Sequence, residues 1–588
     1  MKTKYLATIL ISLAALSSCE MGLTPNDSSN SQTGGEITLV KTLNSKVYFG
    51  TLESTYSLPC SFFSVAEDVP YIKFSDFFGG VHKEIITPGQ ETGIYTWSDS
   101  VVTNRLTKAT MVFDVDNNTI STGDFDLFKS IAGETTTIHD DTFEVRADKS
   151  AEIVEDECSR IAGNAMIWDM DRYNMKLVSY ENEVYAPYSV YQTLFFSRFK
   201  LNITFNGADF YLYDSLSVFA DKDNNLTDYA KAIYDGPLAK ISERSKSYSN
   251  YYYGSFLFAM ETSNGKLSGK AFANDLDGVL KAYGLKDKML SSNSDIADEA
   301  LCDAVALIFA DGGHTGTYGT GISVAPDTTR EINYLRKVFA TDERLKARQA
   351  LSTALSTQRG VSEFKTALDH LKKSGQTAII TFDGFSLTSA STSPTKEEVE
   401  SDNKSTFGIL YNCFKEIEKD NSIKKVVLDV SLNGGGAVMA LGQSLSFITN
   451  ENITINTKDP VTGASNSETV RYDTDLDGDF ADDDSYAGKY DFYILTSPYS
   501  FSCGNAFPCI AKDNGWAKII GQRSGGGDCA VGYAMSVDGA LWQMSSPMMI
   551  TREDGSSVDD GAAVDYTLDY SYFYDAAKLD SYLTNLPA

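Results

Sequence analysis

The chain has 588 residues, too many for a single hydrophobic core, so several domains are expected. Its 50 basic and 80 acidic residues give a formal charge of -30 at pH 7, which argues against nucleic acid or anionic lipid as a partner. The same excess of carboxylates is typical of a solubilised, exported protein.

The N-terminus carries the pattern of an export signal. Two lysines precede an apolar run of about a dozen residues, too short to span a bilayer as a mature helix. The run ends in Leu-Ser-Ser-Cys19, which resembles the box of a bacterial lipoprotein, whose cysteine is lipidated and becomes the mature N-terminus. We therefore predict a lipoprotein signal peptide at 1–18, lipidation of Cys19 and a flexible polar tether at 19–36. The alternative is an ordinary signal peptide with a coincidental cysteine.

This anchor places the expected protein on a membrane, facing the periplasm or the cell surface. Seven further cysteines follow Cys19, an odd number without a metal-binding spacing, so a disulfide framework is not expected. Cys503 and Cys509 could form a bridge in an oxidising compartment, and the sequence does not decide between the bridge and free thiols.

Three regions precede the C-terminal part of the chain. Residues 37–150 alternate short β-branched and aromatic runs with turn residues, which predicts a β-rich N-terminal module. A strand-rich connector is expected at 151–225. Residues 226–375 are predicted to be mainly helical, because apolar residues recur three and four positions apart, as in ADEALCDAVALIFADGG.

The second half of this helical region holds two histidines. A helical stretch is expected over 328–373, followed by a turn at Gly375. His370 lies among charged residues of that stretch and is predicted to be solvated. His314 follows the apolar helix directly and could simply cap its end.

Residues 376–588 alternate strand and helix. Short apolar runs in TAIITFDGF, KKVVLDVSL, YDFYILTSP and AKIIGQ predict buried strands, and an amphipathic helix is expected over 396–419. Such alternation is typical of an α/β domain with a largely parallel sheet. The whole chain is therefore predicted to be a multidomain α/β protein.

Two turns at the ends of these strands contain candidate catalytic groups. In SPYSFSCGNAF the potential nucleophiles are Ser500, Ser502 and Cys503, at a strand-turn-helix junction where a side chain meets the N–H groups of the helix start. In VVLDVSLNGGGAV, the glycines at 434–436 have no Cβ, so their amides can approach a substrate closely. Polar and glycine-rich loops without a chemical role are the alternative.

Three motifs together resemble the C-terminal-processing (tail-specific) serine peptidase family. LDVSLNGGG is similar to its D-[LV]-R-x-N-x-G-G segment, SFSCGNAF to its S-A-[SG]-[ED] nucleophile segment, and GWAKIIGQRSGGG to the strand and G-x-x-[ST]-x-G turn that follow. The resemblance covers about 376–570. It implies an α/β domain of the crotonase-like (ClpP/crotonase) type and favours the branch with the tricorn core and interphotoreceptor retinoid-binding protein-like modules.

The resemblance implies a role for each of several residues. The nucleophile maps to Ser502, and the oxyanion donors map to the Cys503 amide and to that of Gly435 or Gly436. Bacterial processing peptidases have a lysine in T-x-G-K-G, but here that position is Gly527, so a Ser-Lys dyad is not expected.

The tricorn-like branch uses a histidine instead of that lysine. LIFADGGHT resembles its helix-then-D-G-H-T signature, which implies His314 as the general base. The acid that orients the histidine maps to SSVDDGAAVDYTL, where Asp559 and Asp560 are both candidates, while Asp565 is expected to brace the turn.

The function implied is that of an exported, lipid-anchored serine endopeptidase that cleaves peptide bonds in proteins or peptides without a catalytic cofactor. The alternative is a catalytically inactive protein that binds peptides, small ligands or glycans on the same scaffold.

A separate acidic stretch, DTDLDGDFADDD at 473–484, follows the spacing of a calcium loop. Asp473, Asp475, Asp477 and Asp484 stand at the ligand positions, and Gly478 stands at the turn position. This predicts a possible structural calcium site remote from catalysis, and the alternative is a solvated acidic hairpin loop.

Overall fold

The computed structural model describes a large part of the chain. The described residues are 37–87, 91–130, 151–197, 201–214, 218–219, 226–241, 243–270, 274–317, 321–324, 337, 340–360, 364–387, 395–480 and 484–586. The predicted signal peptide, Cys19 and the tether up to residue 36 lie outside them. Leu39–Ala588 forms one compact unit. Among the described helices, none has the length and apolar character needed to cross a membrane.

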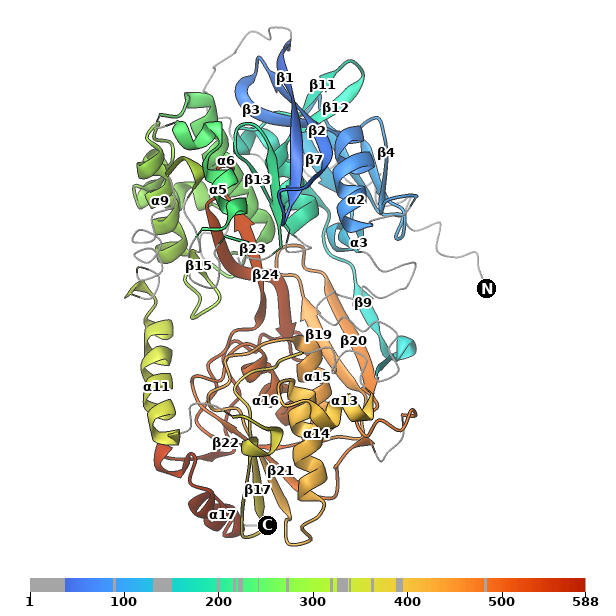
Figure 1. Ribbon diagram of the computed structural model, residues 1–588, viewed down its shortest axis with the longest axis vertical. Helices are drawn as coiled ribbons and strands as arrows, with labels where there is room; N and C mark the ends of the chain where they lie inside the picture. Colours follow the sequence, from blue (N-terminus) through green and yellow to red (C-terminus); the bar gives the residue numbers. More distant parts are fainter. Residues whose placement is uncertain are drawn as a thin grey trace, which may run out of the picture. The chain divides into compact units, whose positions relative to one another are not determined.

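A six-stranded sheet forms the centre of the C-terminal region (Figure 1). Its strands, in spatial order, are β16 (Leu371–Ser374), β17 (Thr377–Thr381), β18 (Lys425–Asp429), β21 (Asp491–Thr496), β22 (Lys518–Gly521) and β25 (Tyr566–Thr567). All neighbours from β17 to β25 are parallel, which confirms the predicted parallel sheet. β16 joins β17 as an antiparallel hairpin through Gly375, whose φ of +54° fits the predicted turn.

Helices cover both faces of this sheet. On one face, alternate strand residues such as Ala378, Val426 and Ile494 pack in a core with α14 (Thr406–Ile417), α15 (Val438–Ser446) and α16 (Cys503–Asp513). On the other face, the intervening residues pack with Leu355 of α11 (Glu343–Arg359) and with α17 (Ala576–Thr584). Strands buried on both faces explain the continuous apolar runs in the sequence.

The N-terminal region is β-rich, as predicted. The strands of a seven-stranded sheet, in spatial order, are β11 (Val178–Tyr180), β12 (Glu183–Pro187), β3 (Ala66–Lys73), β2 (Ser54–Phe63), β1 (Leu39–Phe49), β14 (Phe210–Tyr213) and β13 (Asn202–Phe205). Those of a five-stranded sheet are β10 (Met166–Asp169), β7 (Thr119–Thr122), β6 (Thr110–Asp114), β5 (Val101–Asn104) and β4 (Tyr95–Ser98). Short helical segments accompany them: α1 (Phe74–Asp76), η1 (Phe77–His82), α2 (Lys83–Ile86), α3 (Phe125–Lys129), α4 (Tyr188–Tyr191) and η4 (Gln192–Phe196).

A further seven strands join segments that are distant in the sequence. They are β15 (Gly316–Thr317), β24 (Leu541–Thr551), β19 (Ile453–Lys458), β20 (Ser465–Tyr472) and β8 (Ala151–Ile153), with β23 (Cys529–Met535) on β24 and β9 (Ser159–Ile161) on β20. β15 pairs with β24 in the register Gly316↔Gln543, and Figure 1 shows the two strands together. This pairing brings the segment at Gly316, in the middle of the helical region, next to the C-terminal part of the chain.

The helical region has the predicted character up to the end of α11 but differs after it. In the described residues its α-helices are α5 (Asp228–Tyr234), α6 (Lys246–Ser263), α7 (Leu276–Ala282), α8 (Leu285–Met289), α9 (Ser294–Ile308) and α11. After α11, a short 3-10 helix, η9 (Ala367–His370), and β16 replace the expected continuation of the helix to 373.

The prediction of a solvated His370 is wrong. Its ring is buried and stacks on Phe364 with centroids 4.0 Å apart, and Nδ1 lies 2.6 Å from the Thr381 carbonyl oxygen. The expected amphipathic helix over 396–419 is also two helices, α13 (Lys396–Ser401) and α14. Ser405 ends the break by capping α14, because its side chain accepts the Gly408 amide.

Candidate active site

Ser502 occupies a strained turn between β21 and α16. Its φ of 56° and ψ of -127° lie in a region that residues with a side chain rarely adopt. Two backbone hydrogen bonds hold the turn. The Phe501 amide donates to the Asn433 carbonyl at 3.1 Å, and the Ser502 amide donates to the Gly526 carbonyl at 2.9 Å. The turn is therefore fixed against both of the glycine-rich turns that were predicted from the sequence.

The three candidate nucleophiles differ in their surroundings. Ser500 is fully buried, and its hydroxyl donates to the Val430 carbonyl at 2.7 Å. Cys503 is buried with Sγ 3.1 Å from the Gly436 oxygen, and burial raises the pKa of its thiol to about 12. Ser502 is only half-buried, and no hydrogen bond to its hydroxyl occurs within the described part of the chain. Cys503 and Cys509 are free thiols.

The candidate oxyanion donors are also distinguishable. The Gly435 amide donates to Asn433 Oδ1 at 2.9 Å, so its hydrogen is already engaged. For the Gly436 and Cys503 amides, no oxygen acceptor occurs among the described residues. Cys503 begins α16, where first-turn amides have no intrahelical acceptor and the helix dipole favours negative charge. The Gly436 and Cys503 amides are therefore the ones available to donate to an oxyanion.

His314 lies against the nucleophile turn. Its ring meets the ring of Phe501, the residue before Ser502, edge-on with centroids 4.7 Å apart. Its carbonyl accepts the Gln543 side-chain amide at 2.7 Å, a bond that accompanies the β15–β24 pairing. No hydrogen bond joins the His314 ring to the Ser502 hydroxyl in the described residues. Catalytic hydrogen bonds are often long without substrate.

The surroundings of His314 favour a neutral ring. Burial lowers its pKa, and the cations of Arg348 and Lys266 act in the same direction. The carboxylates of Asp311 and Asp528 oppose them, but the pKa remains below the ordinary value. A neutral imidazole is the form that can accept a proton.

The two predicted acids do not contact His314. Asp559 accepts the Gly527 amide at 2.7 Å and lies 3.1 Å from the Lys266 ammonium. Burial raises the pKa of Asp559, but the Lys266 ammonium and the Gly527 amide outweigh burial and hold this pKa below its ordinary value. Asp560 is exposed and pairs with Arg552 at 3.0 Å. The structure therefore brings Asp559 to the turn at 526–528 and leaves Asp560 at the surface.

Several residues at the site carry no recognised signal in the sequence. Lys266, which follows α6, lies 2.5 Å from Asp528. Asp528 is next to Gly527, the position that maps to the lysine of the bacterial processing peptidases in the sequence resemblance. Burial lowers the pKa of Lys266, but Asp528 and Asp559 outweigh it, so the ammonium stays protonated and unsuited to act as a base. Arg348 of α11 stacks on the Phe501 ring with its guanidinium carbon 3.6 Å from the centroid.

Two side chains brace the turns around the site. Asn505, which stands where the resemblance has an acidic residue, accepts the Ser524 hydroxyl at 2.6 Å and donates to the Val558 carbonyl at 2.9 Å. Asp565 accepts the Ile519 amide and pairs with Lys512, which agrees with its predicted bracing role.

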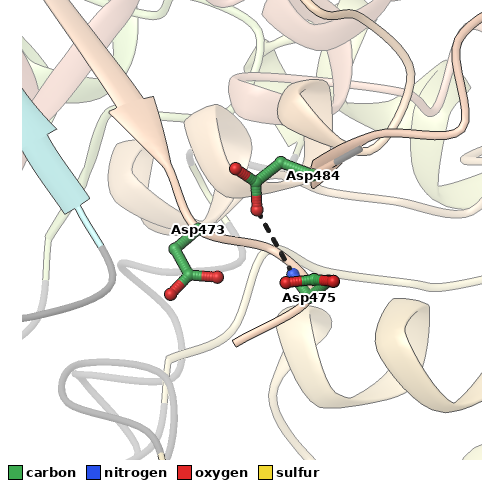
Figure 2. Close-up of side chains that lie close together, drawn as sticks. All are labelled: Asp473, Asp475 and Asp484. Carbon is green, nitrogen blue, oxygen red and sulfur yellow. Dashed lines mark hydrogen bonds between the residues drawn. The ribbon is translucent and has the colours of Figure 1, made fainter. Parts of the chain in front are cut away.

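The acidic loop after β20 gathers three of the four predicted calcium ligands. Carboxylate oxygens of Asp473, Asp475 and Asp484 lie within 4.8 Å of one another, and Figure 2 shows the three side chains. Asp477 is not part of this group; it accepts the Asp479 amide instead. Gly478 has a φ of +95°, as a tight loop at this position requires.

Comparison with known proteins agrees with the sequence motifs. The sequence model of peptidase family S41 matches residues 377–568. Among curated proteins, none matches significantly.

Solved structures resemble parts of the chain at low identity. A candidate peptidase from Parabacteroides merdae ATCC 43184 is 15% identical over 58% of this chain and 97% of its own, with a TM-score of 0.40. The photosystem II D1 C-terminal processing protease is 17% identical over 33% and 42%, with a TM-score of 0.25. A candidate S41 protease from Bacteroides fragilis NCTC 9343 is 12% identical over 37% and 54%, with a TM-score of 0.27. The assignment rests on the sequence model: residues 377–568 form a domain of peptidase family S41, a family of serine peptidases.

Proposed function

We propose that the protein is an exported, lipid-anchored serine endopeptidase with Ser502 as nucleophile and His314 as general base. The observation that carries this proposal is the contact of His314, supplied by the helical region, with Phe501 next to Ser502. Acyl transfer needs a base, a nucleophile and amide donors. Here a buried histidine packs on a strained serine turn, next to a glycine-rich turn at the end of a neighbouring strand. The S41 domain implies protein or peptide substrates.

The chemistry follows from these positions. His314 Nε2 takes the Ser502 hydroxyl proton as Oγ bonds to the scissile carbonyl carbon, and the carbonyl oxygen becomes an oxyanion. The Gly436 and Cys503 amides face this charge. The C–N bond then breaks as His314 returns the proton to the leaving amine, and water releases the acyl group by the same route.

The cellular site is proposed from the N-terminal sequence. Cleavage before Cys19 and lipidation of its thiol would tether the protein to a membrane, facing the periplasm or the cell surface. The net charge of -30 favours this exported setting and argues against nucleic acid as a partner.

A fluorophosphonate probe tests the proposed activity. We expect one equivalent of probe to bind the folded protein, and peptide mass spectrometry to place it on Ser502, because only an activated serine attacks phosphorus at neutral pH. Heat-unfolded protein is the control and should remain unlabelled.

Two results would contradict the proposal. An unlabelled folded protein would favour the alternative, an inactive binder of peptides, small ligands or glycans on the same scaffold. Labelling of Cys503 by an acylating probe would refute Ser502 as the nucleophile.

We also propose that the acidic loop binds a structural calcium ion through Asp473, Asp475 and Asp484. Burial and the charge of Asp475 raise the pKa of Asp473, so a bound cation would relieve the mutual repulsion. Addition of CaCl₂ to protein treated with a chelator should raise the Tm. At a hundredfold excess over Kd, the free energy of unfolding should rise by about 2.7 kcal/mol. Asp484→Asn should remove most of this rise, whereas Asp479→Asn, an exposed residue of the same loop, should retain it. A Tm that calcium leaves unchanged would refute the site.

A further inference from the structure

The Nδ1 side of the His314 ring faces a buried serine and a buried aspartate. Ser545 of β24 has its hydroxyl 3.4 Å from His314 Nδ1, and the same hydroxyl donates to Asp311 Oδ2 at 2.7 Å. The exposed fractions are 5% for His314, 1% for Ser545 and 9% for Asp311. Neither Ser545 nor Asp311 has a role in the site as predicted from the sequence.

Asp311 is held rigidly in this position. Its Oδ1 accepts the amides of His314 and Thr315, each at 2.9 Å, and its Oδ2 accepts the Thr315 hydroxyl at 2.9 Å. The loop that carries His314 is therefore wound around the carboxylate. Because β15 continues from this loop and pairs with β24, the backbone fixes Ser545 opposite the ring.

The single hydroxyl proton of Ser545 decides the tautomer of His314. This proton points to the Asp311 carboxylate, which can only accept. The hydroxyl oxygen then has a lone pair for Nδ1, so a hydrogen bond between Ser545 and the ring requires Nδ1 to carry the ring hydrogen. Nε2 is left without a proton, which is the state that a general base needs.

We propose that Asp311 and Ser545 are positioning residues that hold the His314 ring in its Nδ1–H tautomer and stabilise its charge during catalysis. This inference rests on the proposed function, since it supplies the acid for that same site. The sequence resemblance assigns this role to Asp559 or Asp560, but their carboxylates bind Gly527, Lys266 and Arg552.

The pH dependence of kcat/KM distinguishes Asp311 from Asp559 or Asp560 as the acid beside His314. The charged groups that face His314 are Asp311 and Asp528, which raise its pKa, and Arg348 and Lys266, which lower it. Asp311→Asn removes the stronger of the two carboxylate effects, so the pKa of His314 should fall. The acid limb of kcat/KM against pH should therefore move to lower pH, although the rate itself drops.

The experiment compares Asp311→Asn, Ser545→Ala and Asp559→Asn in the full chain with a peptide substrate. We expect kcat to fall about 10²- to 10⁴-fold in Asp311→Asn and about 10- to 100-fold in Ser545→Ala, with KM changed less than about twofold. Only Asp311→Asn should shift the acid limb. Ser536→Ala is the matched control, because its buried hydroxyl also donates to an aspartate, Asp538 at 2.6 Å, and it should keep the wild-type kcat and pH profile.

Nitrogen NMR of histidine-labelled protein gives a readout that does not depend on turnover. His314 should show the Nδ1–H tautomer in the wild type and lose this preference in Ser545→Ala, with His314→Gln used to assign its signals. Wild-type kcat and pH profiles in both Asp311→Asn and Ser545→Ala would overturn the inference. A fall in kcat confined to Asp559→Asn would also overturn it. Absence of fluorophosphonate labelling in the wild type would instead refute the proposed function, and the tautomer measurement would still test the contact.

Discussion

Replacement of Ser502 with alanine is expected to lower kcat for peptide hydrolysis by about 10⁴-fold or more, with little loss of stability. The Ser502 hydroxyl makes no hydrogen bond within the described residues, so its removal leaves no buried partner unsatisfied. It is also the only one of the three candidate side chains that is not fully buried. Initial rates on an unfolded protein or a quenched peptide, with Tm from thermal unfolding, measure both effects.

Ser500→Ala and Cys503→Ala are the matched controls for this substitution. The Ser500 hydroxyl joins the Val430 carbonyl to the Ser497 amide, so its loss should cost about 1–3 kcal/mol of stability but keep turnover in the folded fraction. Cys503 contributes a backbone amide, which alanine preserves. If Ser502→Ala retained hydrolysis while Cys503→Ala lost it, the nucleophile would be the thiol.

The local sequence predicts the central sheet well because each strand is buried on both faces. The apolar runs at 377–381, 425–429 and 491–496 are strands at the expected positions. The turn at Gly375 is equally local, since its φ of +54° suits glycine. Such features depend only on neighbours in the sequence.

Features that depend on contacts between distant segments were not predicted from the sequence. His370 lies in a charged segment, yet the hairpin of β16 and β17 buries its ring. The surroundings of His314 depend on the pairing of β15 with β24, which joins two segments more than two hundred residues apart, so no local pattern could place Ser545 there. The ion pair of Lys266 with Asp528 also joins two segments that are distant in the sequence. Asp311 alone had a local clue, because an aspartate three residues before His314 can accept its amide.

Gly435 should tolerate no side chain, and Gly435→Ala is expected to reduce kcat/KM by about 10³-fold. A Cβ at this position would lie 2.6 Å from the Ser502 Cβ and 3.0 Å from its hydroxyl oxygen, closer than real contacts allow. The φ of +112° adds backbone strain of about 1–3 kcal/mol. Movement of the nucleophile by about 1 Å lowers the rate by about 10²-fold. Displacement of the adjoining Gly436 amide weakens an oxyanion donor, and the loss of such a donor lowers the rate by a similar factor.

Gly515→Ala separates this collision from general backbone strain. Gly515 has a φ of +74° just after α16, but a Cβ there would meet no atom within 4 Å. Both variants should therefore lose Tm, and only Gly435→Ala should lose turnover and fluorophosphonate labelling in the folded fraction. Equal activity per folded molecule in the two variants would mean that the glycine turn does not touch the reacting serine. In that case the close approach of Gly435 to Ser502 would serve the packing of the turn and not catalysis.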